Sequence, residues 1–571
     1  MEAGKRTVDD IFNGNKILEV PFFQRAYVWD EPQWERFLED VEDVSKTHVP
    51  YFMGSLILKQ KSTPADASIG NVRTVIDGQQ RLTTLSILMK VLSLKSGNTK
   101  KFEKNFMIDD GVPVLQHNRN DRETYNKIIS LTSLEKLTGK DKISRAYQYF
   151  ADHMNESELD FNAISNCVLF VGVDLDFYED EQQIFDTINS LGVRLTTAEL
   201  LKNYFFGRDD ISDYEKYWVE IFEKDDDTKE YWDQEITTGR LKRTFIDLFF
   251  YAYLLIKIQE PALNVSAEDK QSFTKVDKLF DSYKRFIKTY LADNKKAVLK
   301  EIKEYAALFR NTFDSSVINK ELPAEAGIER LNAIIFALDT ATLIPYILFS
   351  ERNIDDQNQK DDLYAYLEAY IMRRLVSRQT TKNYNQLFAE RLILNRVLSK
   401  EELAEHLAGQ DDKVNRMPSD EEVKAAFHES ILTNKYAAGV LYLIESKIRN
   451  RSLHATQLLG IGKYSLEHLM PKKWQNHWNF SGDKLAAEAR SRTLLTLGNL
   501  TIITQALNAS IRDSDWKTKK DGTDNKGGLI QYADGIETLT KYLALDKWDE
   551  VEIDKRADDL ASSALKIWSL Q

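Results

Sequence analysis

The sequence predicts an α+β protein that is mostly helical and contains several domains. Its 571 residues exceed what a single hydrophobic core usually supports. Residues 1–207 mix strand-like and helix-like patterns, whereas apolar residues from about 208 to 460 recur almost wholly at helical spacing. We therefore predict three regions: a mixed α/β domain at 1–207, a helical linker domain at 208–360, and helices around a small site with strands at 361–571.

The composition narrows the classes of protein that remain. A hydrophobic content of 42% is typical of a globular chain, and the single cysteine, Cys167, excludes a disulfide framework and a cysteine-based zinc site. The chain starts without an apolar signal region, and no window reaches the roughly 18 apolar residues that a membrane span needs. We therefore expect a cytoplasmic protein without membrane contact. Its net charge of −13 argues against nonspecific coating of nucleic acid, so any DNA contact needs a local basic patch.

Strand and helix signals alternate in the first region. Asp30 followed by Pro32 is typical of a helix start, and Thr196 with Glu199 forms a capping-box pattern for another helix. Three apolar segments bounded by turn residues are predicted to be strands: 51–59, 71–78 and 168–175.

The middle of the chain reads as a series of helices. Two examples of helical spacing are Leu241/Phe245/Leu248/Phe249 and Leu363/Tyr366/Leu367/Tyr370. A basic stretch in this otherwise acidic chain contains Arg373, Arg374 and Arg378. These arginines either form salt bridges on a helix surface or follow the phosphates of a DNA strand.

A polar constellation near the C-terminus carries the strongest chemical signal. Glu467 and His468 are adjacent, and the amides Asn499 and Asn508 follow nine residues apart. Carboxylate and amide oxygens are hard ligands for Mg²⁺, and a neutral imidazole beside them can accept a proton from water. A lone histidine is usually a surface or core residue, but Pro471 and the turn before Asn499 indicate a strand, a loop, a second strand and then a helix. This order is typical of a ββα-metal (HNH) nuclease site.

A second constellation lies where a predicted strand ends at Asp77-Gly78 and a helix begins with Gln79-Gln80-Arg81. The backbone N–H groups of a helix start together with Arg81 make an anion site. The glutamine amides can read a base edge or orient a water molecule. The alternative is a tight turn whose polar residues merely cap the helix.

Both constellations resemble the GmrSD-like type IV restriction endonucleases. The matching C-terminal blocks are Leu466-Glu467-His468-Leu469-Met470-Pro471, Leu497-Gly498-Asn499-Leu500 and Asn508. The resemblance implies that His468 is the general base, that Glu467 and Asn508 hold one Mg²⁺ or Mn²⁺ ion, and that Asn499 orients the imidazole or braces the loop. Lys517 is expected either to contact a phosphate or to belong to a solvated run of charges, and His477 is the rival histidine.

The N-terminal resemblance is to the ParB/sulfiredoxin-like domain of the same family, which binds and hydrolyses a nucleoside triphosphate. The blocks are Pro21-x-x-Gln-Arg-x-Tyr-x-Trp, Asp77-Gly-Gln-Gln-Arg and Phe185-x-x-x-Asn-x-x-Gly. They imply a GTP or ATP site at Asp77, Gly78, Gln79, Gln80 and Arg81, lined by Arg25 and Asn189, with Lys202 and Asn203 as further phosphate contacts. Gln24, Tyr27 and Trp29 are expected to sense modified DNA, although Tyr27 and Trp29 suit a core equally well.

The sequence therefore predicts a nucleotide-regulated, metal-dependent DNA endonuclease that restricts foreign, modified phage DNA. Its partners would be double-stranded DNA, a nucleoside triphosphate and, as one option, a second copy in a homodimer. The alternatives are an NTP-hydrolysing sensor or a DNA-binding regulator, each with an inactive nuclease domain.

Overall fold

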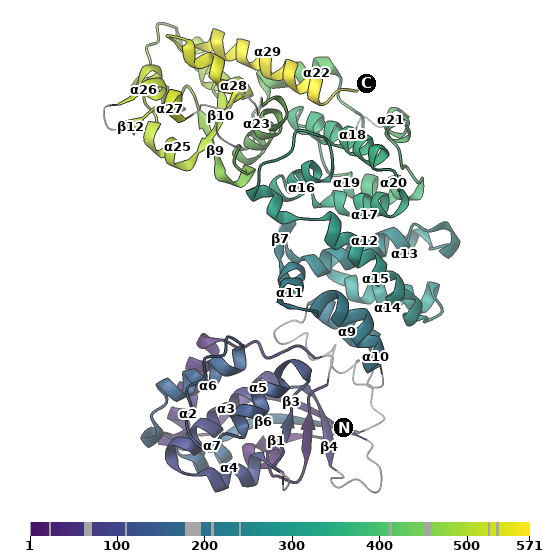
Figure 1. Ribbon diagram of the computed structural model, residues 1–571, viewed down its shortest axis with the longest axis vertical. Coiled ribbons are helices and arrows are strands. Elements are labelled where there is room, and N and C mark those ends of the chain that lie inside the picture. The colour runs from purple at the N-terminus through teal and green to yellow at the C-terminus, as the bar shows by residue number, and fades with distance from the viewer. Residues whose placement is uncertain are drawn as a thin grey trace. The chain divides into compact units, whose positions relative to one another are not determined.

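The chain divides into two compact units, Met1–Trp218 and Val219–Gln571 (Figure 1). The computed structural model describes residues 2–21, 24–61, 71–108, 111–176, 196–206, 210–238, 241–409, 414–449, 458–523, 526–532 and 536–570. The predicted α+β class with mostly helical content is confirmed. The three predicted domain boundaries stay a prediction.

The N-terminal unit contains a mixed sheet whose described strands have the order β1-β6-β3-β4-β2-β5. Strand β3 is central, since it pairs in parallel with β6 and antiparallel with β4. The three predicted strands are present as β3, β4 and β6. The bounds are β1 Glu2–Thr7, β2 Ile17–Glu19, β3 Tyr51–Gln60, β4 Val72–Asp77, β5 Leu115–Gln116 and β6 Val168–Leu175.

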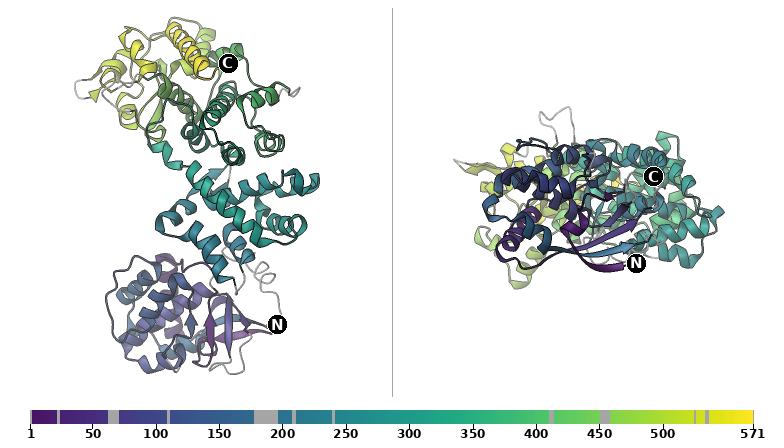
Figure 2. Two further views of the ribbon diagram at one scale, coloured as in Figure 1. Left: turned by 45° about the vertical axis from the view of Figure 1, so that its right-hand side comes forward. Right: turned by 90° about the horizontal axis from the view of Figure 1, so that it is seen from below.

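Helices cover one face of this sheet, and Figure 2 shows the same layering from a second direction. Helix α3 (Gln79–Ser96) is buried almost all round, and its buried residues include polar ones such as Thr83 and Lys90. The other helices are α1 Val8–Ile11, α2 Glu31–Thr47, α4 Thr99–Phe106, α5 Arg119–Ile129, α6 Lys142–His153, η1 Glu156–Glu158, α7 Phe161–Cys167, α9 Thr197–Phe205, α10 Ile211–Tyr214 and η2 Glu215–Glu223, which spans the division between the units.

Both predicted helix starts are present. The Asp30 side chain caps α2 in a capping box with Gln33, and Pro32 lies in the first turn. Thr196 and Glu199 form the capping box of α9. Local sequence therefore fixed where these two helices begin.

The first part of the C-terminal unit is helical, with one correction to the sequence prediction. Leu241 lies on strand β8 of a short hairpin, and the helix begins only after Thr244 caps α12. The elements are α11 Asp226–Asp233, β7 Glu235–Thr238, β8 Leu241–Thr244, α12 Phe245–Lys257, η3 Pro261–Leu263, α13 Ala267–Phe273, η4 Val276–Lys278, α14 Leu279–Tyr290, α15 Lys295–Thr312, η5 Ser315–Asn319, α16 Ile328–Ala337, η6 Ala341–Leu343, α17 Ile344–Asn353, α18 Gln357–Val376, α19 Tyr384–Gln386, η7 Leu387–Arg391, α20 Leu392–Leu394, α21 Lys400–Ala408, α22 Asp420–Glu429 and α23 Asn434–Ile448.

The last part of the chain has the predicted order of strand, loop, strand and helix in β9, β10 and α25, and the loop holds an additional helix, α24. The elements are η8 Ile461–Lys463, β9 Tyr464–His468, η9 Trp474–Asn476, α24 Lys484–Thr493, η10 Leu497–Asn499, β10 Leu500–Thr504, α25 Gln505–Ile511, α26 Trp516–Asp521, β11 Gly522–Thr523, β12 Lys526–Gly527, α27 Leu529–Tyr532, α28 Glu537–Thr540, η11 Lys541–Ala544 and α29 Glu550–Ile567.

Buried polar bonds join this last part to the helices before it. The indole of Trp568, just after α29, donates to Glu368 Oε1 on α18 at 3.1 Å, and Glu368 is held by both ends of the buried Arg330 guanidinium. Glu445 on α23 accepts hydrogen bonds from the backbone N–H groups of Glu537 and Thr538 at the start of α28. These bonds make the C-terminal unit one body. Among the described helices, none is long and apolar enough to cross a membrane.

Candidate functional site

The antiparallel pair β9–β10 and the helix α25 bring the C-terminal polar residues together. In the register of this pair, His468 lies opposite Leu500 and Glu467 lies opposite Thr501. Thr504 caps α25, and that helix carries Asn508 back alongside β9. The Asn508 amide nitrogen donates to Ser465 Oγ at 3.1 Å and to the Leu466 carbonyl at 3.2 Å. Both bonds use Nδ2, and among the described residues no hydrogen bond to the amide oxygen of Asn508 is found.

A lysine that sequence reasoning missed holds Glu467 in place. Lys519 on α26 is fully buried, and its ammonium forms an ion pair with Glu467 Oε1 and donates to the His468 carbonyl at 2.7 Å. Burial raises the pKa of the Glu467 carboxyl and lowers the pKa of Lys519, and the ion pair opposes both shifts. Lys519 shares the buried face of α26 with Trp516 three residues earlier, a helical spacing that could have revealed it. Lys517, the lysine that the sequence indicated, is exposed.

His468 is held as a neutral imidazole. Burial, together with the nearby charges of Lys472 and Lys519, lowers the pKa of His468 to about 4. The ring is therefore unprotonated at neutral pH, as a group that accepts a proton must be. The rival His477 is exposed and lies on the segment between η9 and α24.

Asn499 braces the loop and does not face the imidazole. Its side chain is fully buried, and the amide oxygen accepts from the Met470 N–H at 2.8 Å and from the Trp548 indole at 3.0 Å. The amide nitrogen donates to the carbonyls of Met470 and Leu494 at 2.8 and 3.0 Å. Because these four bonds satisfy the amide within the protein, the contacts of Asn499 favour bracing of the loop over orientation of the imidazole.

Glu467 and Asn508 provide oxygen donors on elements next to His468. The described residues contain no group of three or more His, Cys, Asp or Glu side chains able to hold a metal. They do place the Glu467 carboxylate and the Asn508 amide oxygen on neighbouring elements, with one Glu467 oxygen paired to Lys519. Such a pair suits Mg²⁺ or Mn²⁺, which retain several positions for water and phosphate oxygens.

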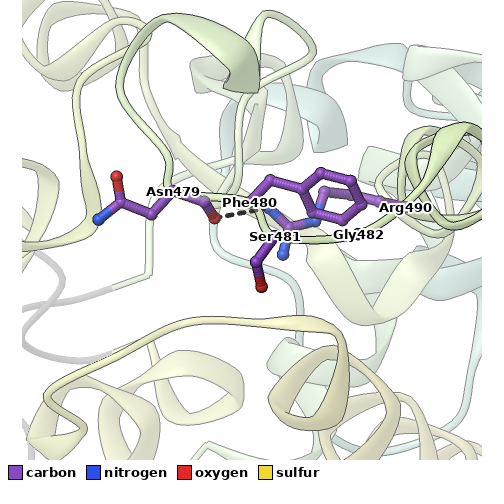
Figure 3. A pocket seen from close by; sticks show the side chains of 5 residues that line it. All are labelled: Asn479, Phe480, Ser481, Gly482 and Arg490. Atoms are coloured by element: carbon purple, nitrogen blue, oxygen red, sulfur yellow. Dashed lines mark hydrogen bonds between the residues drawn. The ribbon is translucent and has the colours of Figure 1, made fainter.

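A shallow cavity of about 360 Å³ opens in the segment that follows, between residues 479 and 490 (Figure 3). Its one charged side chain, Arg490, is already engaged: it pairs with Glu550 through two nitrogens and donates to the Asn479 carbonyl at 3.2 Å. The guanidinium also stacks against the rings of Trp474 and Phe480. Arg490 therefore fastens this segment to α29.

The strand–helix turn at Asp77–Gln79 forms as predicted. Gly78 has a φ of 106°, and a Cβ there would come within 2.8 Å of the Leu56 side chain, so only glycine fits. No side chain caps the start of α3, which leaves its first N–H groups directed at the turn. Arg81 donates to Asp77 Oδ2 and to the Ser55 carbonyl, both at 2.8 Å, so a guanidinium and a carboxylate meet at this helix start.

The two glutamines of the turn hold neighbouring backbone. Gln79 donates to the Arg25 carbonyl at 3.1 Å, whereas Gln80 accepts from the Val28 N–H at 2.8 Å and donates to the Ala26 carbonyl at 3.3 Å. Their amide groups are therefore not free to read a base. They fix the segment that presents Arg25, whose Nη1 lies 3.8 Å from Glu199 Oε1 on α9.

Three predicted DNA-sensing residues are also structural. Gln24 is buried and donates to the carbonyls of Val75 and Ile76, which ties it to β4. Tyr27 is buried, shares a hydrogen bond with Thr84 and accepts one from the Trp34 indole. Trp29 packs, partly buried, against the same core. The core interpretation of Tyr27 and Trp29 is thus the one that their surroundings favour.

Two regions of the chain match the sequence models of one family. The sequence model for the N-terminal domain of GmrSD restriction endonucleases matches residues 8–206, and the model for the C-terminal domain matches residues 417–563. The chain belongs to the GmrSD restriction endonuclease family. Membership in this family implies a hydrolase that cleaves DNA in restriction. No curated protein matches the chain.

Two of the arginines that the sequence led us to expect at a DNA-binding surface, Arg373 and Arg374, are buried inside the C-terminal unit. Arg373 is buried and donates to the carbonyls of Trp568 and Pro418, and Arg374 is buried and donates to the carbonyls of Arg416 and Thr380. Their guanidinium groups hold loops together inside the unit and cannot reach a phosphate. Arg378, four residues further on, is exposed. Asn189 lies outside the described residues.

Proposed function

We propose that this protein is a nucleotide-regulated DNA endonuclease of the HNH type that acts with one divalent metal. The observation that carries the proposal is the placement of a neutral His468 and the Glu467 carboxylate on β9, beside Asn508 of α25, whose amide bonds to Ser465 and Leu466 of that strand. Membership in a restriction endonuclease family supports DNA as the substrate.

In the proposed reaction His468 accepts the proton of a water molecule as its oxygen attacks the phosphorus. The bond between phosphorus and the leaving sugar oxygen then breaks. Glu467 and Asn508 would hold Mg²⁺ or Mn²⁺, which supplies stabilisation of the charge that builds on the phosphate. Lys519 fixes Glu467 and the His468 carbonyl, and Asn499 fixes the loop at Met470, so both act as positioning residues. Lys517, exposed on α26, is proposed as a phosphate contact.

The regulatory nucleotide is proposed to bind at the start of α3. The uncapped N–H groups and the Arg81 and Arg25 guanidinium groups suit the phosphates of GTP or ATP. Asp77 is held by Ser55 and Arg81, and it would face a hydroxyl or a metal carried by the nucleotide. Hydrolysis of that nucleotide, modified phage DNA as the substrate and a homodimer remain parts of the proposal.

Cleavage assays on the full-length protein test this function. Plain, hydroxymethylated, glucosylated and phosphorothioate DNA would each be incubated with Mg²⁺, Mn²⁺ or EDTA, with and without ATP or GTP. We expect cleavage of at least one modified DNA only when metal is present, and a rate that changes when nucleotide is added.

One observation favours a second candidate, an NTP-hydrolysing sensor with an inactive nuclease domain. The proposed metal ligand Glu467 already has an internal cation, Lys519, as its partner. Nucleotide hydrolysis without DNA cleavage under every metal condition would support this sensor and contradict the endonuclease. No turnover of nucleotide or DNA would point to a DNA-binding regulator.

A further inference from the structure

A cavity of about 560 Å³ lies in the C-terminal unit, away from β9 and α25. It is bounded by the end of α18 and the chain after it, the turn that follows α16, and the start of α23, which Figure 1 draws near one another. Leu338 and Leu375 contribute apolar surface, Tyr436 supplies an aromatic ring, and several threonines add hydroxyl groups. This mixture of apolar surface and a few polar groups is typical of a small-molecule site, and the volume is within the usual range.

The charged side chains around the cavity are two cations, Arg378 and Lys382, and one carboxylate, Asp339. Arg378 and Lys382 are both exposed, and no hydrogen bond or ion pair of either side-chain cation is found among the described residues. The acidic lining residue, Asp339, is already paired with Lys435. The cavity therefore presents two free cations and a neutralised carboxylate, which favours an anionic ligand.

Arg378 and Asp339 have a left-handed backbone conformation, which is uncommon for residues other than glycine. Arg378 has a φ of 53° and Asp339 a φ of 54°, and both follow the end of a helix. Their helices close with the bonds from Gln379 N–H to the Arg374 carbonyl and from Thr340 N–H to the Ile335 carbonyl. Such a left-handed position after a helix normally holds glycine. Both residues place a charged side chain beside the same cavity.

We propose that this cavity binds a nucleoside phosphate, with Arg378 and Lys382 on the phosphate and Tyr436 beside the base. Guanidinium and ammonium groups recognise phosphate oxygens, and a base stacks on an aromatic ring irrespective of its identity. Two sources share this chemistry: a free nucleotide and one nucleotide of a DNA strand. The site is separate from the turn at Asp77 and needs no metal, so it does not depend on the proposed nuclease reaction.

Arg396 provides a matched control. It too has a positive φ, 49°, after a short helix, but its guanidinium donates to Asn353 Oδ1 and lies over the Phe349 ring, outside the cavity. Arg378→Gly and Arg396→Gly both relieve backbone strain, so neither should impair folding. Only Arg378→Gly removes a cation from the cavity.

Calorimetric titration of the metal-free full chain tests the proposal with two probes: a panel of AMP, GMP, CMP and UMP, and a 5′-phosphorylated pentadeoxythymidylate. We expect Arg378→Gly and Lys382→Ala each to weaken binding by about tenfold or more, because each removes a charged hydrogen bond. Arg396→Gly should leave this binding unchanged, because its side chain lies outside the cavity. Binding of the monophosphates identifies a free nucleotide as the source, and binding of the oligonucleotide alone identifies a DNA strand. Absence of binding by both probes, or binding that survives in the Arg378→Gly/Lys382→Ala double variant, would overturn the proposal.

Discussion

The turn at the start of α3 and the β9–β10 pair use their polar residues in opposite ways. At the turn, the side chains of Gln79 and Gln80 hold neighbouring backbone. At the strand pair, Lys519 from α26 holds the His468 carbonyl and Asn499 braces the loop, so neither task falls to the His468 side chain. The comparison teaches that a polar residue of a motif is available to contact a ligand only when other residues make the hydrogen bonds that hold the backbone.

Lys519→Met gives the largest expected loss of stability. It leaves the Glu467 carboxylate buried without a partner, which costs about 3–5 kcal/mol of unfolding free energy. Urea denaturation followed by fluorescence measures the difference. Lys517→Met, two residues away and exposed, should stay within about 0.5 kcal/mol of the unaltered protein. Equal effects of the two variants would show that Lys519 does not brace the site.

The two asparagines of the strand pair should separate stability from activity. Asn499→Ala leaves the Met470 N–H and the Trp548 indole without an acceptor, and we expect a loss of about 2–4 kcal/mol in the same denaturation experiment. Asn508→Ala should cost under about 1 kcal/mol, yet it should weaken Mn²⁺ binding measured by calorimetry. An Asn499→Ala protein as stable as the unaltered one would contradict the distinction between a residue that braces the loop and a residue that binds the metal.

The glycines at the two ends of α3 test why the turn before this helix requires glycine. Gly78→Ala introduces a Cβ 2.8 Å from Leu56 and strains a φ of 106°, and about 2–3 kcal/mol of stability should be lost. Gly97 at the other end also has a positive φ, 76°, but meets nothing within 4 Å. Gly97→Ala should therefore cost only about 1 kcal/mol. Thermal unfolding of the two variants in parallel measures the difference, and equal costs would mean that Leu56 yields freely.

A buried histidine in the N-terminal unit gives an effect that depends on pH. Burial lowers the pKa of His117 to about 3, from its ordinary value near 6.5 in the unfolded chain. The unfolded state therefore binds a proton first, and stability falls by about 1.4 kcal/mol per pH unit as the pH drops below 6.5 towards 3. His117→Gln should remove this component from the pH dependence of the urea midpoint, whereas His477→Gln, at an exposed position, should leave it. An unchanged slope in His117→Gln would contradict the burial of a neutral imidazole.

Local sequence predicted the elements better than the contacts. The strands at 51–60 and 72–77 and the capped start at Asp30 depend on residues a few positions apart, and these predictions are confirmed. Lys519 and Arg373 could not be assigned in this way, because their partners lie 52 and 195 residues away along the chain. A basic pair such as Arg373-Arg374 looks like a DNA-binding surface until the carbonyl groups that bury it are known.

Parallel assays of one variant test the central claim most directly. His468→Ala should lower the rate of plasmid cleavage by about 10²–10⁴-fold, because it removes the proposed proton acceptor, while hydrolysis of ATP or GTP proposed at the turn before α3 continues at its original rate. His477→Ala should leave both rates unchanged. Undiminished nicking of plasmid DNA by His468→Ala would contradict the assignment of this histidine and, with it, the proposed nuclease site.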